Sequence, residues 1–257
     1  MAEIIPLPET KCGYLPDKQS RMVYAFYGPI SEASTYPDEY RKFKFEKLQQ
    51  GFLAQSFSVC ATICNDCNAC LPLRINTSKF KYSDGHERIL KRASKAGLIY
   101  QWERAMPFPQ LYPLYKKYVQ TRHPQSEMVT DSADDFYANL STNTDLLIIG
   151  TEKSLKGFAR IDRLDNEASL EYIAFDPSNK KLSLGTLAWL NTIEWTKTQK
   201  IDHIYIGQIN PSQSMLYKAN FRGLETIVDG EWVDFDPKIH TSGPNFHAML
   251  KAEGLNL

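Results

Sequence analysis

The region from Leu146 to Asp176 holds three short apolar runs, and this pattern constrains the fold more than any other feature of the chain. The runs are LLIIGT, LKGFARIDRL and SLEYIAFD, separated only by the polar breaks EKS and DNEA. Strand-forming runs joined by breaks this short are typical of hairpins. The sequence therefore predicts a meander of antiparallel strands.

Helical and strand patterns follow this meander. The stretch DPSNKKLSLGTLAWLNTIEWTKTQK turns and opens a helix near Ser183, with Leu184, Leu187, Ala188 and Trp195 on one stripe. HIYIGQ then predicts a strand, SQSMLYKANF a short helix and GEWVDF a last strand. Nothing patterned is visible from Pro237 onward.

Two helices are expected before the meander. HERILKRASKAGLIYQW is compatible with a helix, and LYPLYKKYVQTRH predicts another directly after the prolines of MPFPQ. The second places Tyr112, Tyr115 and Tyr118 at a spacing of three, which favours a core stripe over a binding site.

This order of elements is that of the acyltransferase fold, in which a splayed mixed sheet holds an acyl donor against a helix start. We expect an α+β protein of two domains: a cysteine-bearing N-terminal domain at residues 1–105 and an acetyltransferase-like (GNAT-type) mixed-sheet domain at 106–257. The loop before the helix normally carries several glycines that bind pyrophosphate. KKLSLG has only Gly185, with Lys180 and Lys181, which counts against an acetyl-coenzyme A acetyltransferase.

Charge is uneven along a chain that is neutral overall. Lys plus Arg and Asp plus Glu number 30 each, so total charge argues neither for nucleic acid nor for a membrane. Residues 71–122 nevertheless hold eleven basic and three acidic residues. Such a segment indicates either a local site for a polyanion or a solvated helix face.

The N-terminus MAEIIPLPET lacks the pattern of a signal peptide, and no apolar run approaches the roughly 20 residues of a membrane span. A cytoplasmic protein is therefore expected. In a reducing compartment an odd set of five cysteines argues against a disulfide framework.

Cys64, Cys67 and Cys70 lie three residues apart, as in the start of a ferredoxin-type run, but position 74 holds arginine where that run places its next ligand. A four-thiolate site needs a remote partner. Cys12 is the natural candidate and Cys60 the spare. The alternatives are reduced, metal-free thiols that pack as small apolar groups, or catalytic or regulatory thiols.

The chain resembles the aminoacyl-tRNA–protein transferase family in an ordered set of segments that covers roughly residues 12–236. They are CGYLPDKQSRMVYA, CNDCNACLPLRI, YKKYVQTRH, SLEYIAFDP, KKLSLGTLAWLNTIEW, HIYIGQ, SMLYKANFRGLE and GEW. By length it is similar to the compact bacterial aspartate/glutamate leucyltransferases rather than to the longer arginyltransferases.

The resemblance implies an enzyme that transfers an amino acid, leucine being favoured, from aminoacyl-tRNA to the N-terminal α-amino group of proteins that begin with Asp or Glu. The product would be marked for N-degron proteolysis. Transfer itself would need no cofactor. The alternatives are arginyl transfer, or a metal or redox sensor that binds peptide N-termini without transfer.

The resemblance also makes an iron–sulfur cluster plausible at Cys12, Cys64, Cys67 and Cys70, although thiolates alone equally suit zinc. Two departures stand out. YSDGHER keeps only Arg88 of a paired-arginine run that family members often show after the cysteines, and Gln208 with Ile209 follows Gly207 where aromatics are common.

Site residues are expected in four groups. Asp162 and Glu171, on neighbouring strands, are candidates to take or orient the amine proton, and Tyr172, Tyr217 and Lys218 are candidate catalytic donors. Arginine binds carboxylates bidentately, so Arg74 and Arg122 are expected to bind the acidic acceptor residue, supported by His123. For tRNA the expected contacts are Arg88, Lys91, Arg92 and Lys95 on one helical face, with Lys180, Lys181 and Gly185 before the later helix.

Overall fold

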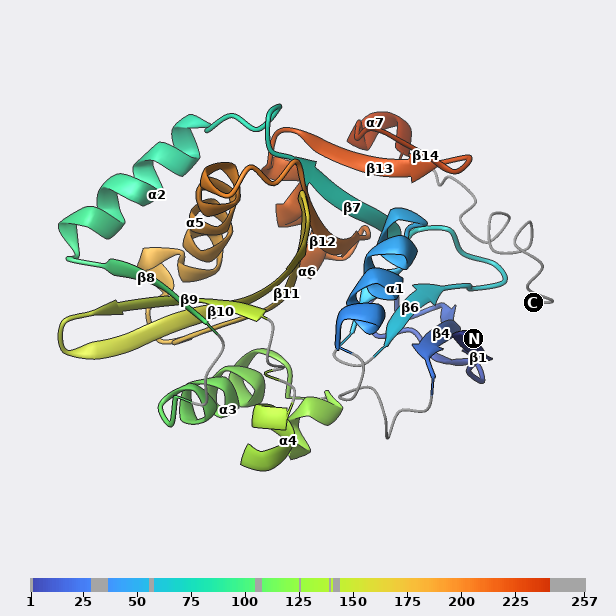
Figure 1. Cartoon of the computed structure of the whole chain (residues 1–257), viewed down its shortest axis with the longest axis horizontal. Helices are drawn as coiled ribbons and strands as arrows, with labels where there is room; N and C mark the ends of the chain where they lie inside the picture. Colours follow the sequence, from blue (N-terminus) through green and yellow to red (C-terminus); the bar gives the residue numbers. More distant parts are fainter. Residues whose placement is uncertain are drawn as a thin grey trace. The chain divides into compact units, whose positions relative to one another are not determined.

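The computed structural model describes residues 2–28, 37–55, 58–104, 108–124, 126–138, 140 and 144–240. By its contacts the chain forms two compact units, residues 1–81 with 203–257 and residues 82–202. In Figure 1 the first unit includes the blue and orange to red ends of the chain, and the second the green and yellow middle. The predicted domain boundary at residues 105 and 106 lies outside the described residues, and that division stays a prediction.

The first unit contains a small antiparallel sheet in the order β1-β4-β6-β5. Its strands are β1 Ala2–Pro6, β4 Met22–Tyr27, β5 Leu53–Ala54 and β6 Val59–Thr62, accompanied by the helix α1 Pro37–Gln49 and the short pair β2 Thr10–Lys11 and β3 Gln19–Ser20. Val23, Ala25, Phe43 and Val59 are among the residues that bury its core. Alternate burial along β4 follows the period of two of a half-buried strand.

A second antiparallel group in the first unit joins distant segments. Its order is β14-β13-β7-β12. The strands are β7 Leu71–Asn76, β12 His203–Ile209, β13 Leu224–Val228 and β14 Glu231–Asp234, and α6 Gln213–Leu216, η4 Tyr217–Asn220 and α7 Pro237–His240 complete this part. The strand that follows the cysteines is therefore paired on both edges by C-terminal strands.

The second unit is built on the predicted meander, which is confirmed. Strands β8 Ile99–Arg104, β9 Thr144–Thr151, β10 Ser154–Leu164 and β11 Glu167–Phe175 pair consecutively and antiparallel. The helices are α2 Asp84–Lys95, α3 Leu111–Arg122, η2 Glu127–Thr130, α4 Ala133–Ala138, η3 Lys180–Leu182 and α5 Leu184–Thr198. The expectation of an α+β fold is confirmed.

The apolar stripes also lie where the periodicity predicted them. Tyr115 is buried in a core with Leu114, Val119 and Phe158, and Tyr112 and Tyr118 pack against it. Leu184, Leu187 and Ala188 are buried in α5. An amphipathic helix buries the face on which its apolar residues recur, so the helical period of the apolar residues was enough to locate these helices.

None of the helices among the described residues is long and apolar enough to cross a membrane.

Gly223 offers a test of how tightly β13 joins β7. Its φ is +73°, and a Cβ there would lie 2.9 Å from both the Asn76 oxygen and the Phe80 nitrogen. Gly230 also has a positive φ, +88°, but a Cβ would meet nothing within 4 Å. We predict that Gly223→Ala lowers the free energy of unfolding by about 3 kcal/mol or more and Gly230→Ala by about 1 kcal/mol, measured by urea denaturation. Equal losses would show that backbone strain alone, without the clash, accounts for both.

Candidate functional site

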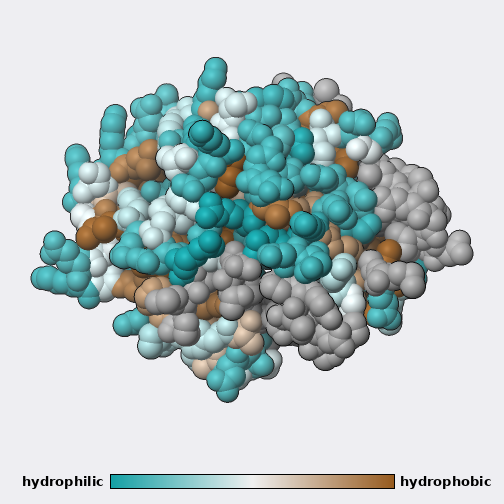
Figure 2. Space-filling model, viewed as in Figure 1, coloured by the Kyte–Doolittle hydropathy of each residue, from teal (hydrophilic) through white to brown (hydrophobic). Residues whose placement is uncertain are grey.

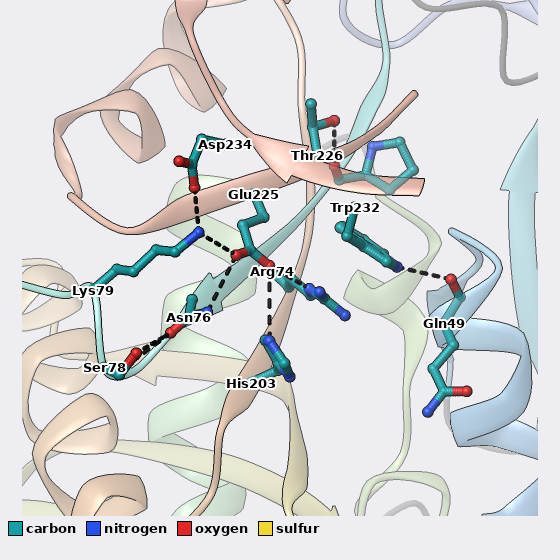
Figure 3. A network of polar contacts seen from close by, with 11 residues as sticks. Gln49, Arg74, Asn76, Ser78, Lys79, His203, Glu225, Thr226, Trp232 and Asp234 are labelled. Atoms are coloured by element: carbon teal, nitrogen blue, oxygen red, sulfur yellow. Dashed lines mark hydrogen bonds and ion pairs between the residues drawn. The ribbon is translucent and has the colours of Figure 1, made fainter. Parts of the chain in front are cut away.

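A buried carboxylate organises the polar residues between β7 and β13 (Figure 3). Glu225 is 4% exposed and pairs directly opposite Arg74 in the strand register. Arg74 Nε donates to its Oε2 over 2.8 Å, and Asn76 Nδ2 donates to its Oε1 over 3.2 Å. Lys79 Nζ lies 3.0 Å from Oε1 and His203 Nε2 3.8 Å from Oε2. This one group therefore gathers donors from β7, the following turn and β12.

The pKa of Glu225 records the balance of these effects. Burial acts to raise it, but the hydrogen bonds from Lys79 and Arg74 outweigh burial and hold the pKa below its usual value. The hydrogen bonds that Lys79 donates to Asp234 and Glu225 in turn raise the pKa of Lys79. Glu225 is thus ionised at neutral pH, with two cations beside it.

Arg74 is held on its Nε side and over one face. Its Cζ lies 4.5 Å from the centroid of the Trp232 ring, and Trp232 Nε1 donates to the Gln49 carbonyl at the end of α1 over 2.8 Å. Tyr205 packs edge-on against the same indole, with ring centroids 5.8 Å apart. Within the described ranges Glu225 is the one polar partner of Arg74. Figure 3 shows the terminal nitrogens pointing away from it.

The predicted metal ligands all fall in the first unit, as free thiols. The Leu15 amide donates to Cys12 Sγ over 3.4 Å, and the Arg21 amide donates to Cys64 Sγ over 3.5 Å. Cys70 accepts from Asn210 Nδ2 over 3.8 Å. Cys60, the spare, lies in β6 and accepts from Gln55 Nε2 over 3.7 Å.

These thiols do not form a ready-made metal site. Among the residues that the structure describes, which include all five cysteines, no group of three or more His, Cys, Asp or Glu side chains is placed to hold an ion. Ligation of an iron–sulfur cluster or zinc by Cys12, Cys64, Cys67 and Cys70 stays a prediction; after burial, the charges of Cys64, Cys12 and Cys67 each act to raise the pKa of Cys70.

Burial controls the chemistry of two of the thiols. It raises the pKa of Cys60 to about 12 and that of Cys70 to about 11, against a lowering by their amide donors. Burial and the neighbouring Cys70 and Cys12 also raise the pKa of Tyr14, while a hydrogen bond with Gln208 lowers it. Neutral thiols beside Tyr14 and Gln208 are poor nucleophiles, which counts against a catalytic thiol here.

Lys218, a predicted catalytic donor, is buried in η4 with 7% of its surface exposed. Its Nζ donates to the carbonyls of Ile206 and Gln208, over 2.8 and 2.7 Å. Burial lowers its pKa to about 8. The neighbouring Tyr217 is 41% exposed.

The other predicted catalytic residues lie in the second unit. Asp162 and Glu171 do occupy neighbouring strands, and both are largely buried. Asp162 accepts from the Arg163 amide over 2.9 Å, and Glu171 is ion-paired with Arg160 over 3.4 Å. Each carboxylate is thus already engaged within the protein, Asp162 by a hydrogen bond and Glu171 by an ion pair.

Tyr172 stands in the aromatic cluster of the second unit. Its ring packs against Tyr115, 5.5 Å between centroids, and Tyr115 bonds to the Asp131 carboxylate. The Tyr172 hydroxyl is buried and has no hydrogen-bond partner among the described residues. Burial raises its pKa. A neutral donor without a partner suits a hydrogen bond to a bound oxygen.

Arg122 and His123 are exposed at the end of α3. The His123 ring lies edge-on to Tyr118, 5.5 Å between centroids. Although the residue as a whole is exposed, partial desolvation of the imidazole and then the charge of Arg122 lower the pKa of His123, which favours its neutral form.

The predicted tRNA contacts come together on one side of the second unit. Arg92 Nη1 donates to the Lys181 carbonyl over 2.6 Å, which ties α2 to η3. We call this the basic surface; its exposed residues are Arg88, Lys91, Arg92, Lys95, Lys180 and Lys181. Hydrophilic side chains cover most of the described face in Figure 2.

Gly185, also predicted to contact tRNA, lies close to a neighbouring ring. A Cβ at this position would be 3.0 Å from the Phe175 ring, so the absence of a side chain allows α5 to approach β11.

Sequence reasoning missed several members of these sites. Asn210 and Thr62 lie in segments with no local signal. Lys79 lies in the basic segment 71–122 and Glu225 is the last residue of SMLYKANFRGLE, but neither had an assigned role, and only the fold brings these residues to Arg74 and the cysteines. Trp232 lies in the GEW segment and Gln208 in HIYIGQ, so both were inside noted motifs without an assigned role.

The thiols give a direct test of this environment. Because the thiolate is the reactive form, we predict that Cys60 and Cys70 react with iodoacetamide at pH 8 at least tenfold more slowly in the folded protein than in urea. Mass spectrometry of each peptide would measure the rates, and they should rise steadily toward pH 11. Alkylation of Cys70 at the unfolded rate would contradict the burial described here.

Comparison with known proteins gives one consistent relationship. The family model "Arginine-tRNA-protein transferase, C terminus" matches residues 110–228. The aspartate/glutamate leucyltransferase of Pseudoalteromonas atlantica is 34% identical over 86% of this chain and 92% of its own length. That of Marinobacter nauticus is 29% identical over 88% of this chain and 92% of its length.

Solved structures similar to the chain include the PaiA N-acetyltransferase of Thermoplasma acidophilum in complex with coenzyme A. The TM-score is 0.39 at 13% identity, over 50% of this chain and 99% of that one. The sequence relationship is the stronger, since it extends over nearly all of both chains. The chain belongs to the aminoacyl-tRNA–protein transferase family, and it is a transferase.

Proposed function

We propose that the protein transfers leucine from leucyl-tRNA to the α-amino group of proteins that begin with Asp or Glu. The names of its relatives support both the donor and the acceptor. In this proposal the product carries an N-terminal leucine that marks it for N-degron proteolysis. Arginine is the alternative donor residue, because the matching family model describes arginine-tRNA-protein transferases.

The geometry of Arg74 is the observation that carries the acceptor specificity. A guanidinium held at Nε by Glu225 and over its face by Trp232 keeps its terminal donors in one orientation. Such a fork matches a carboxylate bidentately. Lys79 bonds to the other oxygen of Glu225 and to Asp234, so two cations face two carboxylates here, and it is the terminal donors of Arg74 that remain for an acceptor. The side chain of an N-terminal Asp or Glu would bind there. Arg122 and His123, in the second unit, stay predicted acceptor contacts.

The reaction asks for positioning more than for an activated nucleophile. An α-amino group has a pKa near 8, so about a tenth is neutral at pH 7, and an aminoacyl ester is already activated. Holding the two together supplies the larger part of the acceleration. The attack forms the peptide bond and releases the 2′- or 3′-hydroxyl of the tRNA. The amine proton goes to a base or to solvent.

Roles for the remaining predicted residues follow from their surroundings. Tyr217 is exposed and suits a direct contact with donor or acceptor. The buried Tyr172 hydroxyl suits a bond to an oxygen of the donor. Asp162 and Glu171 remain the candidate bases, although Glu171 would first have to release Arg160.

The basic surface would bind the phosphates of the acceptor stem, and Gly185 stays a predicted contact at its edge. The six charges lie on α2 and η3, two elements joined by the Arg92 bond. Binding through phosphates releases counterions and weakens with salt.

The first experiment offers labelled leucyl-tRNA and arginyl-tRNA separately to the purified protein, with peptides that begin with Asp, Glu or Ala. We predict transfer of leucine to the Asp and Glu peptides only. Transfer from arginyl-tRNA instead would support the alternative donor. An Asp peptide that binds but never receives an amino acid from either donor would refute the proposal and favour a sensor.

Arg74 can be tested with its charge retained. We predict that Arg74→Lys lowers kcat/KM for the Asp peptide about 100-fold, because a lysine cannot form the bidentate contact. The KM for leucyl-tRNA should not change. Arg222→Lys, an exposed arginine, is the matched control. An Arg74→Lys enzyme with wild-type kcat/KM would remove Arg74 from the acceptor site.

The basic surface can be tested through salt dependence. Each lost phosphate contact should reduce the slope of log affinity against log salt by about 0.7 to 0.9. We predict this reduction for Lys91→Gln and again for Lys95→Gln, measured with leucyl-tRNA by filter binding. Lys153→Gln, in the exposed turn between β9 and β10, serves as control. Slopes equal to wild type for both variants would place the tRNA elsewhere.

A further inference from the structure

Strand β12 contains one extra residue relative to β7, the strand with which it pairs. In the register with β7, Tyr205 lies opposite Arg74 and Gln208 lies opposite Pro72. Three steps along β12 therefore match two along β7. The extra residue is a β-bulge, a feature that re-aims side chains in a strand.

The bulge decides which side of the sheet Gln208 faces. Successive side chains alternate in a regular strand, so residues three apart point to opposite faces. With one extra residue, Gln208 instead shares a face with Tyr205, and hence with Arg74 opposite it. Its contacts agree: Gln208 Oε1 accepts from Thr62 Oγ1 in β6 over 3.1 Å, and its side chain bonds with Tyr14. Gln208 is half-buried there.

Lys218 binds both ends of this bulge. Its Nζ donates to the carbonyls of Ile206 and Gln208, the residues on either side of Gly207. Gly207 has a φ of +77°, and a Cβ there would lie 3.5 Å from Nζ. The conformation favours glycine, and the ammonium satisfies two carbonyls that a regular ladder would use.

An ammonium in this place is destabilising by itself. Lys218 is 7% exposed, and its polar partners among the described residues are the two carbonyls, with no carboxylate. A buried charge without an opposite charge is costly, and such groups cluster at functional sites. With two of its donors engaged by the backbone, it is poorly placed to act on a substrate directly.

We infer that Lys218 is a positioning residue: it holds the β12 bulge and thereby sets Gln208 on the face of Arg74 as a second contact for the acceptor's N-terminal residue. This rests on the proposed acceptor role of that face. The Gln208 amide, oriented by Thr62 and Tyr14, offers a hydrogen bond to the peptide beside the Arg74 carboxylate contact. Lys218 takes no part in the chemical step.

Two measurements test the inference separately: one reports the position of the Gln208 side chain, and the other its contribution to peptide binding. In the full chain labelled with ¹⁵N, the side-chain amide signal of Gln208, assigned by its loss in Gln208→Ala, is compared between wild type and Lys218→Met. Lys153→Met, an exposed lysine, is the control for the substitution itself. Thermal unfolding of each variant establishes that it is folded. Gly207→Ala disturbs the same bulge by strain and gives a second route if Lys218→Met does not fold.

Binding of an Asp-initiated peptide, measured without tRNA, gives the functional readout. We expect Gln208→Ala and Lys218→Met each to weaken binding about tenfold, and the double variant to lose no more than either, because both changes remove one contact. In the transfer assay the loss should fall on the KM for the peptide, with kcat within about twofold.

Opposite results overturn the inference. They are an unchanged Gln208 signal in folded Lys218→Met, losses that multiply in the double variant, or a kcat that falls while peptide binding is retained. The proposed function fails separately, through absence of leucyl transfer in the wild type. The Gln208 signal would still report whether Lys218 holds the bulge.

Discussion

The buried carboxylate of Glu225 is the constraint on which the arrangement of the first unit depends. A carboxylate that is 4% exposed is tolerated only with donors around it, and Arg74, Asn76 and Lys79 supply them from β7 and the turn behind it. These bonds fix β13 against β7 in one register. They also decide the direction of the Arg74 guanidinium, because its Nε must face Glu225.

A buried cation complements this buried anion two strands away. Glu225 lies on β13 and the Lys218 ammonium is bound to β12, on either side of β7. Glu225 directs an arginine through a side-chain bond, whereas Lys218 directs a glutamine through the backbone of a bulge. Burial of either charged group lowers the stability of the fold. Glu225 orients the charged donor Arg74, and Lys218 orients the neutral side chain of Gln208. Both results concern the same face of β7 and β12.

Periodicity predicted the elements of this protein better than its sites. The stripe from Tyr112 to Tyr118 and the meander from Leu146 to Asp176 are local patterns, and both are confirmed. The partner of Arg74 is 151 residues away in the sequence, so no local pattern could name Glu225. The bulge was equally invisible, because Gly207 alone does not reveal a positive φ or the lysine eleven residues later that stabilises it.

The residue after Gly207 shows how a departure from the family pattern can follow from its surroundings. The resemblance to the family leads one to expect an aromatic residue there, and a phenyl ring has no carbonyl oxygen to accept the hydrogen bond from Thr62 Oγ1. In this chain the Gln208 amide accepts that bond over 3.1 Å and also engages Tyr14. Asn210, two residues on, donates from its Nδ2 to Cys70 Sγ over 3.8 Å. The amides of residues 208 and 210 thus link β12 and the residue directly after it to the cysteine-bearing segments by hydrogen bonds. The hydrogen bonds of Gln208 and Asn210 therefore connect the cysteine region to the strand that pairs with β7 beside Arg74.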